Sequence, residues 1–590
     1  MQDFAVKNRA WKIIYGLFPV ILFLYPLRHI FVGAEWWDTG YNYGNFVFME
    51  KMDPMWLFST YLGTALGNLF TKLPFGGTMV GLNVYTGLIV SALALLGYFF
   101  FVKVVGLPKG IAFWGELIAI SFCWCPTALL YNYLTYLLMA LGVICLYKAI
   151  MAQESKGQKI LFVFAGVCLG INVFTRFPNL AQMGLIVAVW AMAIIRKEKF
   201  GNVVKDTLFC VLGYVIGLLA VFAVIALKYG AAEYIDGIIR LLGMPSEATD
   251  YSMRSMVEYQ IRNFVQNFLW LRYFVLMTIV CVLGYFVLPG KLLWAKRGAT
   301  VAVFLLGLKY LIGQNMFNMK YSTKMSAFQW GVFLLSAALV ILAVVLIRGK
   351  SFANKEKLLA GLSVLIIVIT PLGSNNHLYS SVNNLFLVAP YILWMLVRFV
   401  QFIPALWKKI SLEPVKIIIA CMLCMITFQG VLFGAFYVFS EGDGGENLHT
   451  RIENNDILKG MRTSEDRAKL ISEISAYVSD TGLQGKEVIL YGNIPAMSYY
   501  LDMPFAISAW PDLRSYNLNV MKSDIAYICG AIDMKGREKP VILLERTMAD
   551  ALTEDAAGED EKLQLIAVMI EEYDYQISFQ NEKFVLYLAN

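Results

Sequence analysis

The 590-residue chain is poor in charge and almost lacks histidine. Asp, Glu, Lys and Arg make up only 15% of its residues, and only three residues are histidine. A metal cluster built from histidines is therefore not expected. The net charge of +7 does not indicate nucleic-acid binding, because most of the basic excess falls in short gaps between apolar stretches, where it would face anionic lipid.

Cysteine chemistry is also weakly represented. Eight of the nine cysteines lie in apolar segments, where they behave as small hydrophobic residues. The ninth, Cys529, is alone in the polar C-terminal part, so no disulfide is expected within that part. The pairs Cys123/Cys125 and Cys421/Cys424 lack the histidine or carboxylate neighbours of a metal site. The C-terminal part has no glycine-rich loop for a nucleotide.

Apolar residues dominate instead, at 59% of the chain with a mean hydropathy of +0.62. Hydrophobic runs long enough to cross a bilayer alternate with short gaps, and every second gap carries lysine and arginine. Because positive charge resists translocation, this alternation predicts about thirteen spans with the N-terminus cytoplasmic and the C-terminus extracytoplasmic. The chain is thus expected to be a multi-pass protein of the plasma (inner) membrane. The predicted spans are Ile13–Val32, Met79–Phe101, Ile111–Pro126, Leu130–Tyr147, Ile160–Phe174, Leu180–Ile195, Leu208–Leu227, Phe268–Leu288, Ala299–Gly313, Ala327–Ile347, Leu358–Thr370, Leu385–Phe399 and Ile417–Phe439.

The expected fold is therefore an all-α polytopic membrane domain, residues 1–440, followed by a small extracytoplasmic α/β domain, residues 441–590. Two long outer loops are expected, 33–78 and 228–267. In the first, Pro54–Phe70 is expected to lie along the membrane interface or to re-enter it, and the second is expected to hold a short surface helix.

The C-terminal domain is expected to contain buried strands at Glu487–Tyr491 and Pro540–Leu544, and two more strands within Tyr575–Leu588. Helices are expected at Ser464–Ser479, with Ser464 as the N-cap, and at Leu563–Tyr573. This domain is interpreted as a lid or docking module without chemistry of its own.

The strongest local signal is Glu35-Trp36-Trp37-Asp38-Thr39-Gly40-Tyr41, directly after the first span. One interpretation is an aromatic belt at the headgroup level, with solvated acids. The other is a carboxylate held against aromatic walls at the membrane face, where it could accept a proton. Glu50 and Asp53 follow in the same loop and are weak candidates for metal ligands.

This beginning resembles the GT-C superfamily of membrane glycosyltransferases, which use polyprenyl-phosphate-linked sugars and include protein mannosyltransferases and aminoarabinose transferases. The resemblance lies in one long span, a large outer loop that opens with an acidic-aromatic stretch, and the segment Pro54-Met55-Trp56. It implies that the catalytic Asp of the first outer loop maps to Asp38, with Glu35 as its nearest substitute. The second long loop has no Asp-x-Asp, and the acidic-aromatic stretch only echoes the Trp-Trp-Asp-Tyr-Gly motif of oligosaccharyltransferases. No cofactor is firmly implied, and dependence on a divalent metal stays open.

Glycosyl transfer from a lipid phosphate also needs cations to stabilise the departing phosphate. The outer-face candidates for substrate binding are Arg176 and the pair Lys320 and Lys324, which flank Tyr321. For all three cations, snorkelling to the headgroups is the alternative. Asn375, Asn376 and His377 could bind sugar hydroxyls, and the alternative is turn-making and helix capping.

The sequence therefore favours a membrane glycosyltransferase that transfers a hexosyl or pentosyl group from a polyprenyl-phosphate sugar to a lipid, glycan or protein acceptor, with the bilayer as its other partner. The alternatives are a transporter or flippase of a lipid-linked substrate and a non-catalytic scaffold of GT-C-like architecture for cell-envelope assembly. A transporter is less favoured because charges inside the spans are few, with Arg28, Glu116 and Lys309 the clear cases, and no internal repeat is evident.

Overall fold

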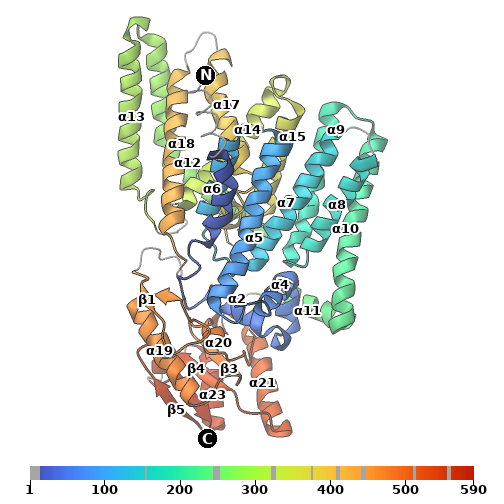
Figure 1. Ribbon diagram of the computed structural model, residues 1–590, viewed down its shortest axis with the longest axis vertical. Helices are drawn as coiled ribbons and strands as arrows, with labels where there is room; N and C mark the ends of the chain where they lie inside the picture. The colour runs from blue at the N-terminus through green and yellow to red at the C-terminus, as the bar shows by residue number, and fades with distance from the viewer. Residues whose placement is uncertain are drawn as a thin grey trace.

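The computed structural model shows a bundle of long helices with a smaller region of helices and strands at one of its ends (Figure 1). It describes residues 14–152, 156–243, 253–319, 327–373, 376–406, 412–439, 447–508, 513–553 and 560–589. The predicted fold class, an all-α membrane part followed by a small α/β part, is confirmed.

The bundle begins with the apolar helix Ile14–Leu27, whose last turn is η1 (Tyr25–Leu27). Its further elements are α2 (Asp38–Val47), η2 (Met49–Lys51), α3 (Pro54–Ser59), α4 (Tyr61–Thr71), α5 (Met79–Phe99), η3 (Phe100–Val105), α6 (Lys109–Phe122), α7 (Leu130–Met151), α8 (Lys156–Asn172), η4 (Phe177–Ile186), α9 (Val187–Arg196), α10 (Phe200–Tyr229), α11 (Ala231–Gly243), α12 (Met253–Val287), η5 (Gly290–Leu292), α13 (Leu293–Gly313), α14 (Ala327–Ile347), η6 (Gly349–Ser351), α15 (Asn354–Ile369), α16 (Tyr379–Asn383), α17 (Ala389–Leu406) and α18 (Glu413–Phe436).

Each predicted span coincides with helical structure. By length and composition, seven of the described helices are long and apolar enough to cross a membrane, and three shorter ones are also apolar. Large apolar side chains are exposed along α10, α12 and α13, and in water such surfaces would be unfavourable. They are suited to contact with lipid tails. They include Leu208, Leu212, Leu219, Leu276, Val280, Leu283, Leu305 and Leu306.

The predicted long loops contain more helix than expected. The 33–78 segment holds α2, η2, α3 and α4, and it packs largely inside the protein. In the 228–267 segment, α10 continues to Tyr229, the expected surface helix is α11, and α12 begins as early as Met253. These helices extend past the apolar window because polar residues continue a helix once it leaves the bilayer.

Basic residues of the gaps cap helix ends. Arg196 donates to the Ile150 carbonyl at the end of α7 (2.6 Å), and Lys296 donates to the carbonyls of Tyr285 (2.9 Å) and Leu288 (2.7 Å) at the end of α12. The turns α9–α10 and α12–α13 lie at the end of the bundle away from the strands (Figure 1). Positive charge at helix C-termini is favourable because the backbone dipoles leave partial negative charge there.

The C-terminal region, defined here as the described residues from 447 to 589, contains a four-stranded sheet in the order β3-β4-β6-β5. Strands β3 and β4 are parallel, and the other neighbours are antiparallel. The predicted strands and both predicted helices are confirmed, and Ser464 stands at the N-cap of α19. The elements are β1 (Thr450–Arg451), β2 (Arg462–Thr463), α19 (Glu465–Asp480), β3 (Val488–Tyr491), α20 (Met497–Tyr500), η7 (Leu513–Ser515), α21 (Leu518–Lys535), β4 (Val541–Glu545), α22 (Arg546–Thr553), α23 (Glu561–Glu572), β5 (Tyr575–Gln580) and β6 (Phe584–Ala589).

Helices α8 and α10 pack closely through glycines on both sides. A Cβ atom at Gly166 would clash with the Cys210 carbonyl, and one at Gly213 would clash with the Val163 carbonyl. Small residues of this kind let helix backbones approach in a membrane, where no hydrophobic effect drives helices together.

We therefore expect Gly213→Val to lower the melting temperature of the protein purified in detergent, by an amount equivalent to about 1–3 kcal/mol of overpacking. Gly284→Val in α12 is the matched control, because nothing lies within 4 Å of a Cβ there. Equal melting temperatures for the two variants would contradict the close α8–α10 packing.

Candidate functional site

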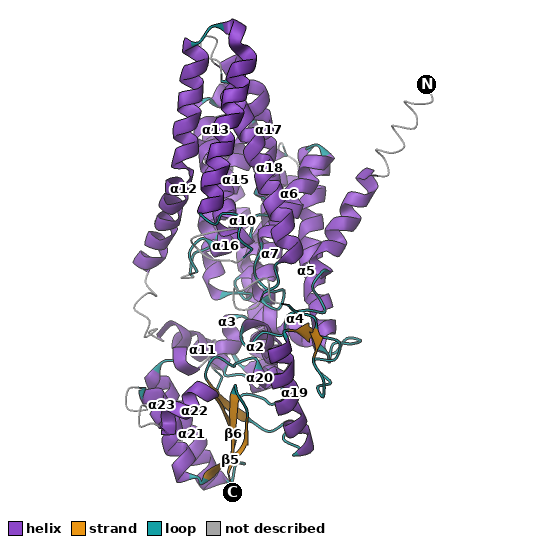
Figure 2. Ribbon diagram, turned by 90° about the vertical axis from the view of Figure 1, so that its left-hand side faces the viewer, coloured by secondary structure: helices purple, strands orange, loops and turns teal. Residues whose placement is uncertain are grey.

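Helix α2 lies between the bundle and the C-terminal region, with α3 and α4 beside it (Figures 1 and 2). Its N-cap residue, Trp37, offers no side-chain acceptor to the first backbone N–H groups. Glu35 takes this role: its carboxylate accepts from the backbone N–H groups of Trp37 and Thr39. The side chain of Glu35 is fully buried. Glu35 therefore orders the first turn of α2, which contains Asp38.

The C-terminal region holds the same turn from the other side. The Tyr500 hydroxyl donates to the Glu35 carbonyl (2.6 Å), and the Ala496 N–H donates to the Trp36 carbonyl (3.0 Å). Gly40 lies directly against Ala496, and a Cβ atom at Gly40 would overlap the Ala496 side chain. Only glycine allows α2 and α20 to approach this closely.

The two tryptophans of the acidic-aromatic stretch contact the C-terminal region. Trp36 is 6% exposed and meets the edge of Phe584, with ring centroids 5.5 Å apart. Arg467 and Lys583 lie 5.8 and 5.9 Å from its ring centroid. The interpretation as an aromatic belt facing the headgroups therefore does not describe Trp36, which anchors the loop to the C-terminal region.

Burial distinguishes the two carboxylates. Glu35 lies in a desolvated site next to Asp38, and burial followed by the charge of Asp38 raises its pKa to about 7, against the backbone hydrogen bonds that favour its charged form. Asp38 is half-buried and so remains accessible. Asp38 is the more exposed of the two, and both Glu35 oxygens are bonded to the backbone.

Asp38 and Arg176 both lie near enough to Tyr131 for their charges to act on its hydroxyl. Tyr131 is half-buried at the start of α7. Helix α4 packs against this position, because Gly63 approaches the Tyr131 backbone too closely for any side chain. The carboxylate, guanidinium and phenol belong to α2, the α8–η4 loop and α7, respectively.

A buried polar network fixes the loop of Arg176. Asn179 donates to the hydroxyls of Thr135 (2.8 Å) and Thr175 (2.9 Å), and Asn172 donates to the Thr135 carbonyl (2.9 Å) and to the side chain of Gln182 (2.8 Å). Arg176 itself is half-buried and donates to the Gly373 carbonyl (3.1 Å). This bond joins its loop to the segment that contains Asn376.

In that segment, the Asn376 carbonyl accepts from the Tyr379 N–H (3.0 Å), and the half-buried His377 adopts φ 52° with its ring 4.6 Å from that of Tyr259. Burial lowers the pKa of His377. Asn383 receives the N–H of Trp124 (3.2 Å), so it supports the loop between α6 and α7. Asn375, Lys320, Tyr321 and Lys324 lie outside the described residues.

The weak metal candidates have structural partners. Glu50 pairs with Lys228 (2.7 Å), while Asp53 caps α3 through the Met55 N–H (2.8 Å) and pairs with Arg240 (3.1 Å). Among the described residues, no group of three or more His, Cys, Asp or Glu could hold a metal ion.

Tyr131, Ala496 and Tyr500 belong to the site and were not found from the sequence. Tyr131 falls at the start of the predicted span Leu130–Tyr147, where no sequence pattern marks it. Tyr500 lies 465 positions after Glu35 in the sequence, and Ala496 is almost as distant. No local sequence pattern connects either residue with Glu35.

The raised pKa of Glu35 predicts a pH dependence of stability. The native state binds a proton more tightly than the unfolded state between pH 4.5 and about 7, so stability is greatest below this window and decreases as pH rises through it. The effect is on the order of 3 kcal/mol, at 1.36 kcal/mol per pH unit. Melting temperatures in detergent should therefore fall with rising pH, and Glu35→Gln should remove most of this fall. Replacing the exposed Glu453 by Gln is the control, and an equal pH dependence in both variants would contradict the assignment.

No protein-family model and no curated protein matches the chain. Solved structures do match. ArnT from Cupriavidus metallidurans, bound to undecaprenyl phosphate, is 11% identical, with a TM-score of 0.43 and 98% of both chains covered. The Archaeoglobus fulgidus oligosaccharyltransferase in complex with Zn and sulfate is 12% identical, with a TM-score of 0.47. The match covers 98% of this chain and 72% of that chain. The same oligosaccharyltransferase tethered to an acceptor peptide with the NVT sequon has a TM-score of 0.45 at 12% identity, with 98% and 73% covered. Both proteins are members of the GT-C superfamily, which the first outer loop of this chain resembles.

Proposed function

We propose that this chain is a membrane glycosyltransferase that moves a sugar from a polyprenyl-phosphate donor to an acceptor hydroxyl or amide on the extracytoplasmic face of the plasma (inner) membrane. The observations that carry the proposal are the half-buried Asp38, fixed at the start of α2 against the C-terminal region, and the half-buried Arg176, whose charge acts together with that of Asp38 on Tyr131. A base and a cation held together at the end of a membrane bundle suit a donor whose tail stays in lipid.

In this mechanism Asp38 accepts the proton of the acceptor group as its oxygen or nitrogen attacks the anomeric carbon. The bond between that carbon and the phosphate oxygen breaks, and the phosphate leaves with the bonding pair and the polyprenyl tail. Arg176 stabilises the negative charge that develops on the leaving phosphate. Tyr131, on which both charges act, donates its hydroxyl to one of the reacting groups. The acceptor is a lipid, a glycan or a protein.

Glu35 is a positioning residue in this scheme, because both its oxygens hold the first turn of α2. The C-terminal region has the same role from the other side, through Ala496 and Tyr500. Its strands and helices thus form a wall of the site and supply no reacting group.

The test of the base is Asp38→Asn, which keeps the size of the side chain and removes its ability to accept a proton. We expect the purified variant to keep its melting temperature and to bind the donor, while sugar transfer to acceptor falls by about 10²–10⁴. Glu35→Gln should lower the melting temperature more than the transfer rate of the folded protein. Transfer at the wild-type rate by Asp38→Asn would remove Asp38 as the base, and full activity of both variants would favour a scaffold.

The test of the cation is Arg176→Gln. A charge-assisted contact in a partly desolvated site is worth about 1.5–3 kcal/mol, so donor binding should weaken about tenfold or more. Lys320→Gln and Lys324→Gln test whether the two lysines share this role. The exposed Arg451→Gln is the control for net charge. Unchanged donor binding in the Arg176 variant would mean that Arg176 only ties its loop to Gly373.

The orientation is tested with single added cysteines in a background in which all nine natural cysteines are replaced by alanine. Ser479 and Ser351 are both exposed, the first on α19 and the second in η6. We expect Ser479→Cys, and not Ser351→Cys, to react with a membrane-impermeant thiol reagent in intact cells. Reversed labelling would place the site on the cytoplasmic face.

A further inference from the structure

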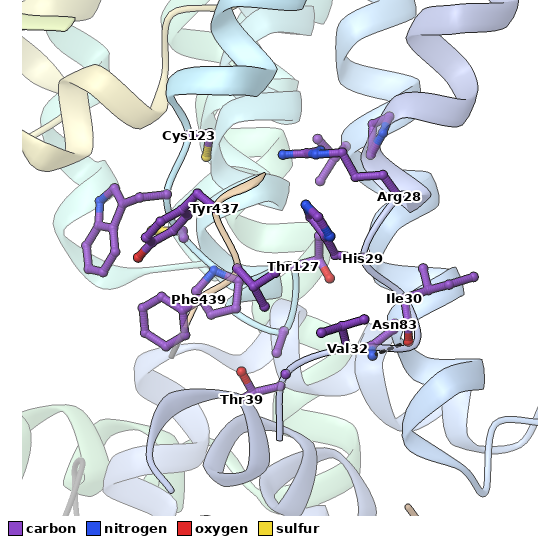
Figure 3. A pocket seen from close by; sticks show the side chains of 18 of the residues that line it. Arg28, His29, Ile30, Val32, Thr39, Asn83, Cys123, Thr127, Tyr437 and Phe439 are labelled. Atoms are coloured by element: carbon purple, nitrogen blue, oxygen red, sulfur yellow. Dashed lines mark hydrogen bonds between the residues drawn. The ribbon is translucent and has the colours of Figure 1, made fainter. Parts of the chain in front are cut away.

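The end of the bundle that carries the C-terminal region is polar inside and apolar at its rim. Inside, the end of the first helix and the α6–α7 loop enclose a cavity of about 110 Å³, and Figure 3 shows Arg28 and His29 facing it. At the rim, where α10 ends, Leu227 is 89% exposed. Water would favour the reverse distribution, with polar side chains outside, so this rim is suited to lipid.

Helix α11, which follows α10, carries three large apolar side chains on one exposed face. Ile235, Ile239 and Leu242 are 52%, 61% and 67% exposed, and their spacing places them on one stripe along the helix. The charged residues of the helix lie together on the neighbouring face, namely Glu233, Asp236 and Arg240. An exposed apolar stripe beside a charged face is typical of a helix that lies in the plane of a membrane surface.

The chain places this stripe at the level where a membrane span ends. Lys228 and Tyr229 close α10, as is common at the interface, and the Lys228 ammonium pairs with Glu50 (2.7 Å). Gly230 then adopts φ 97°, a conformation that glycine reaches without strain, and α11 starts in a new direction. Figure 1 shows α11 at the lower end of α10, and Figure 2 shows it beside α3 and next to the C-terminal region. The apolar surface of α10 therefore continues onto the stripe.

The other side of α11 is fixed to α3 and, through it, to the C-terminal region. Gly237 is buried against α3, and a Cβ atom there would lie only 3.0 Å from the nearest side chain. Arg240 pairs with Asp53, the N-cap of α3 (3.1 Å). Within α3, the Trp56 indole N–H donates to the Ser508 carbonyl of the C-terminal region (2.9 Å). A contact between α11 and lipid is thus transmitted to the C-terminal region through one short helix.

We propose that α11 is a membrane anchor of the C-terminal region. Its stripe of Ile235, Ile239 and Leu242 inserts among the headgroups and upper acyl chains of the leaflet at this end of the bundle, about 5–10 Å into their boundary. The partner is the lipid surface itself, because the stripe continues the lipid-facing surface of α10 and lies where that span ends. The anchor goes beyond the proposed function and uses none of its reacting groups.

The experiment measures the depth of the stripe in the full-length protein, in phosphatidylcholine nanodiscs and the cysteine-free background. Ile239→Cys carries a polarity-sensitive NBD fluorophore, and the bilayer contains lipids with a nitroxide quencher either near the headgroup or at the end of the acyl chain. We expect emission at short wavelength and stronger quenching by the shallow nitroxide than by the deep one. The controls are three exposed positions: Glu233→Cys on the charged face, Leu283→Cys within the span of α12, and Tyr527→Cys on α21.

Glu233→Cys should be quenched less than Ile239→Cys, Leu283→Cys should respond more to the deep nitroxide, and Tyr527→Cys should emit as in water. Ile235→Cys and Leu242→Cys repeat the measurement on the same stripe, in case one labelled variant does not fold. Emission of the stripe as in water would overturn the proposal. Emission at short wavelength without quenching by either lipid would also overturn it, because the stripe would then lie against protein, such as a second copy of the chain.

A second measurement tests the anchoring role. The double variant Ile235→Asp, Ile239→Asp should expel the stripe from lipid, and α21 (Leu518–Lys535) should lose protection from hydrogen exchange in nanodiscs. Glu233→Gln on the charged face should leave this protection unchanged. Unchanged protection in the double variant would contradict the anchoring role. Neither measurement uses turnover, so failure of the anchor and failure of the proposed transferase are separate outcomes.

Discussion

The structure depends on how the first turn of α2 is held between the helical bundle and the C-terminal region. From within the loop, the buried Glu35 carboxylate accepts two backbone N–H groups. From the C-terminal region, Tyr500 and Ala496 bond the backbone of Glu35 and Trp36, and the absence of a side chain at Gly40 brings α20 into direct contact. A residue in this turn is therefore fixed by contacts on both sides, as a preorganised base requires.

This clamp gives the C-terminal region a role in positioning the proposed base. The backbone that precedes this turn is also hydrogen-bonded to the C-terminal region. The Gly33 N–H donates to the Arg462 carbonyl (3.0 Å), and the Arg462 N–H donates to the Phe31 carbonyl (2.8 Å). The end of the first helix, the acidic-aromatic stretch and the C-terminal region are thus joined by main-chain hydrogen bonds. Movement of the C-terminal region would therefore shift the turn that contains Asp38.

The sequence was sufficient for features that depend on local pattern. Alternation of apolar runs and basic gaps placed the membrane helices, and runs such as Val488–Tyr491 and Val541–Glu545 were recognised as buried strands. It was insufficient where partners lie far apart in the chain. For Trp36 the sequence left two interpretations, a membrane belt and a wall around a carboxylate, since nothing near it in sequence shows that Phe584 covers it. Arg28 and Glu116 were noted only as charges in spans, whereas Arg28 lines a cavity and the fully buried Glu116 packs against Gly97 of α5. Glu50 and Asp53 were grouped by proximity in sequence, although each is paired with a different cation.

The central claim is that a lipid phosphate binds where the first turn of α2, the start of α7 and the α8–η4 loop meet. Photo-crosslinking tests it most directly, with a polyprenyl phosphate that carries a diazirine on the carbon next to the phosphate, followed by peptide mapping of the purified protein in nanodiscs. The account predicts crosslinks in residues 123–131 and 172–179 that excess unlabelled polyprenyl phosphate removes. Crosslinks confined to the lipid-exposed faces of α10, α12 and α13, and insensitive to the competitor, would contradict it.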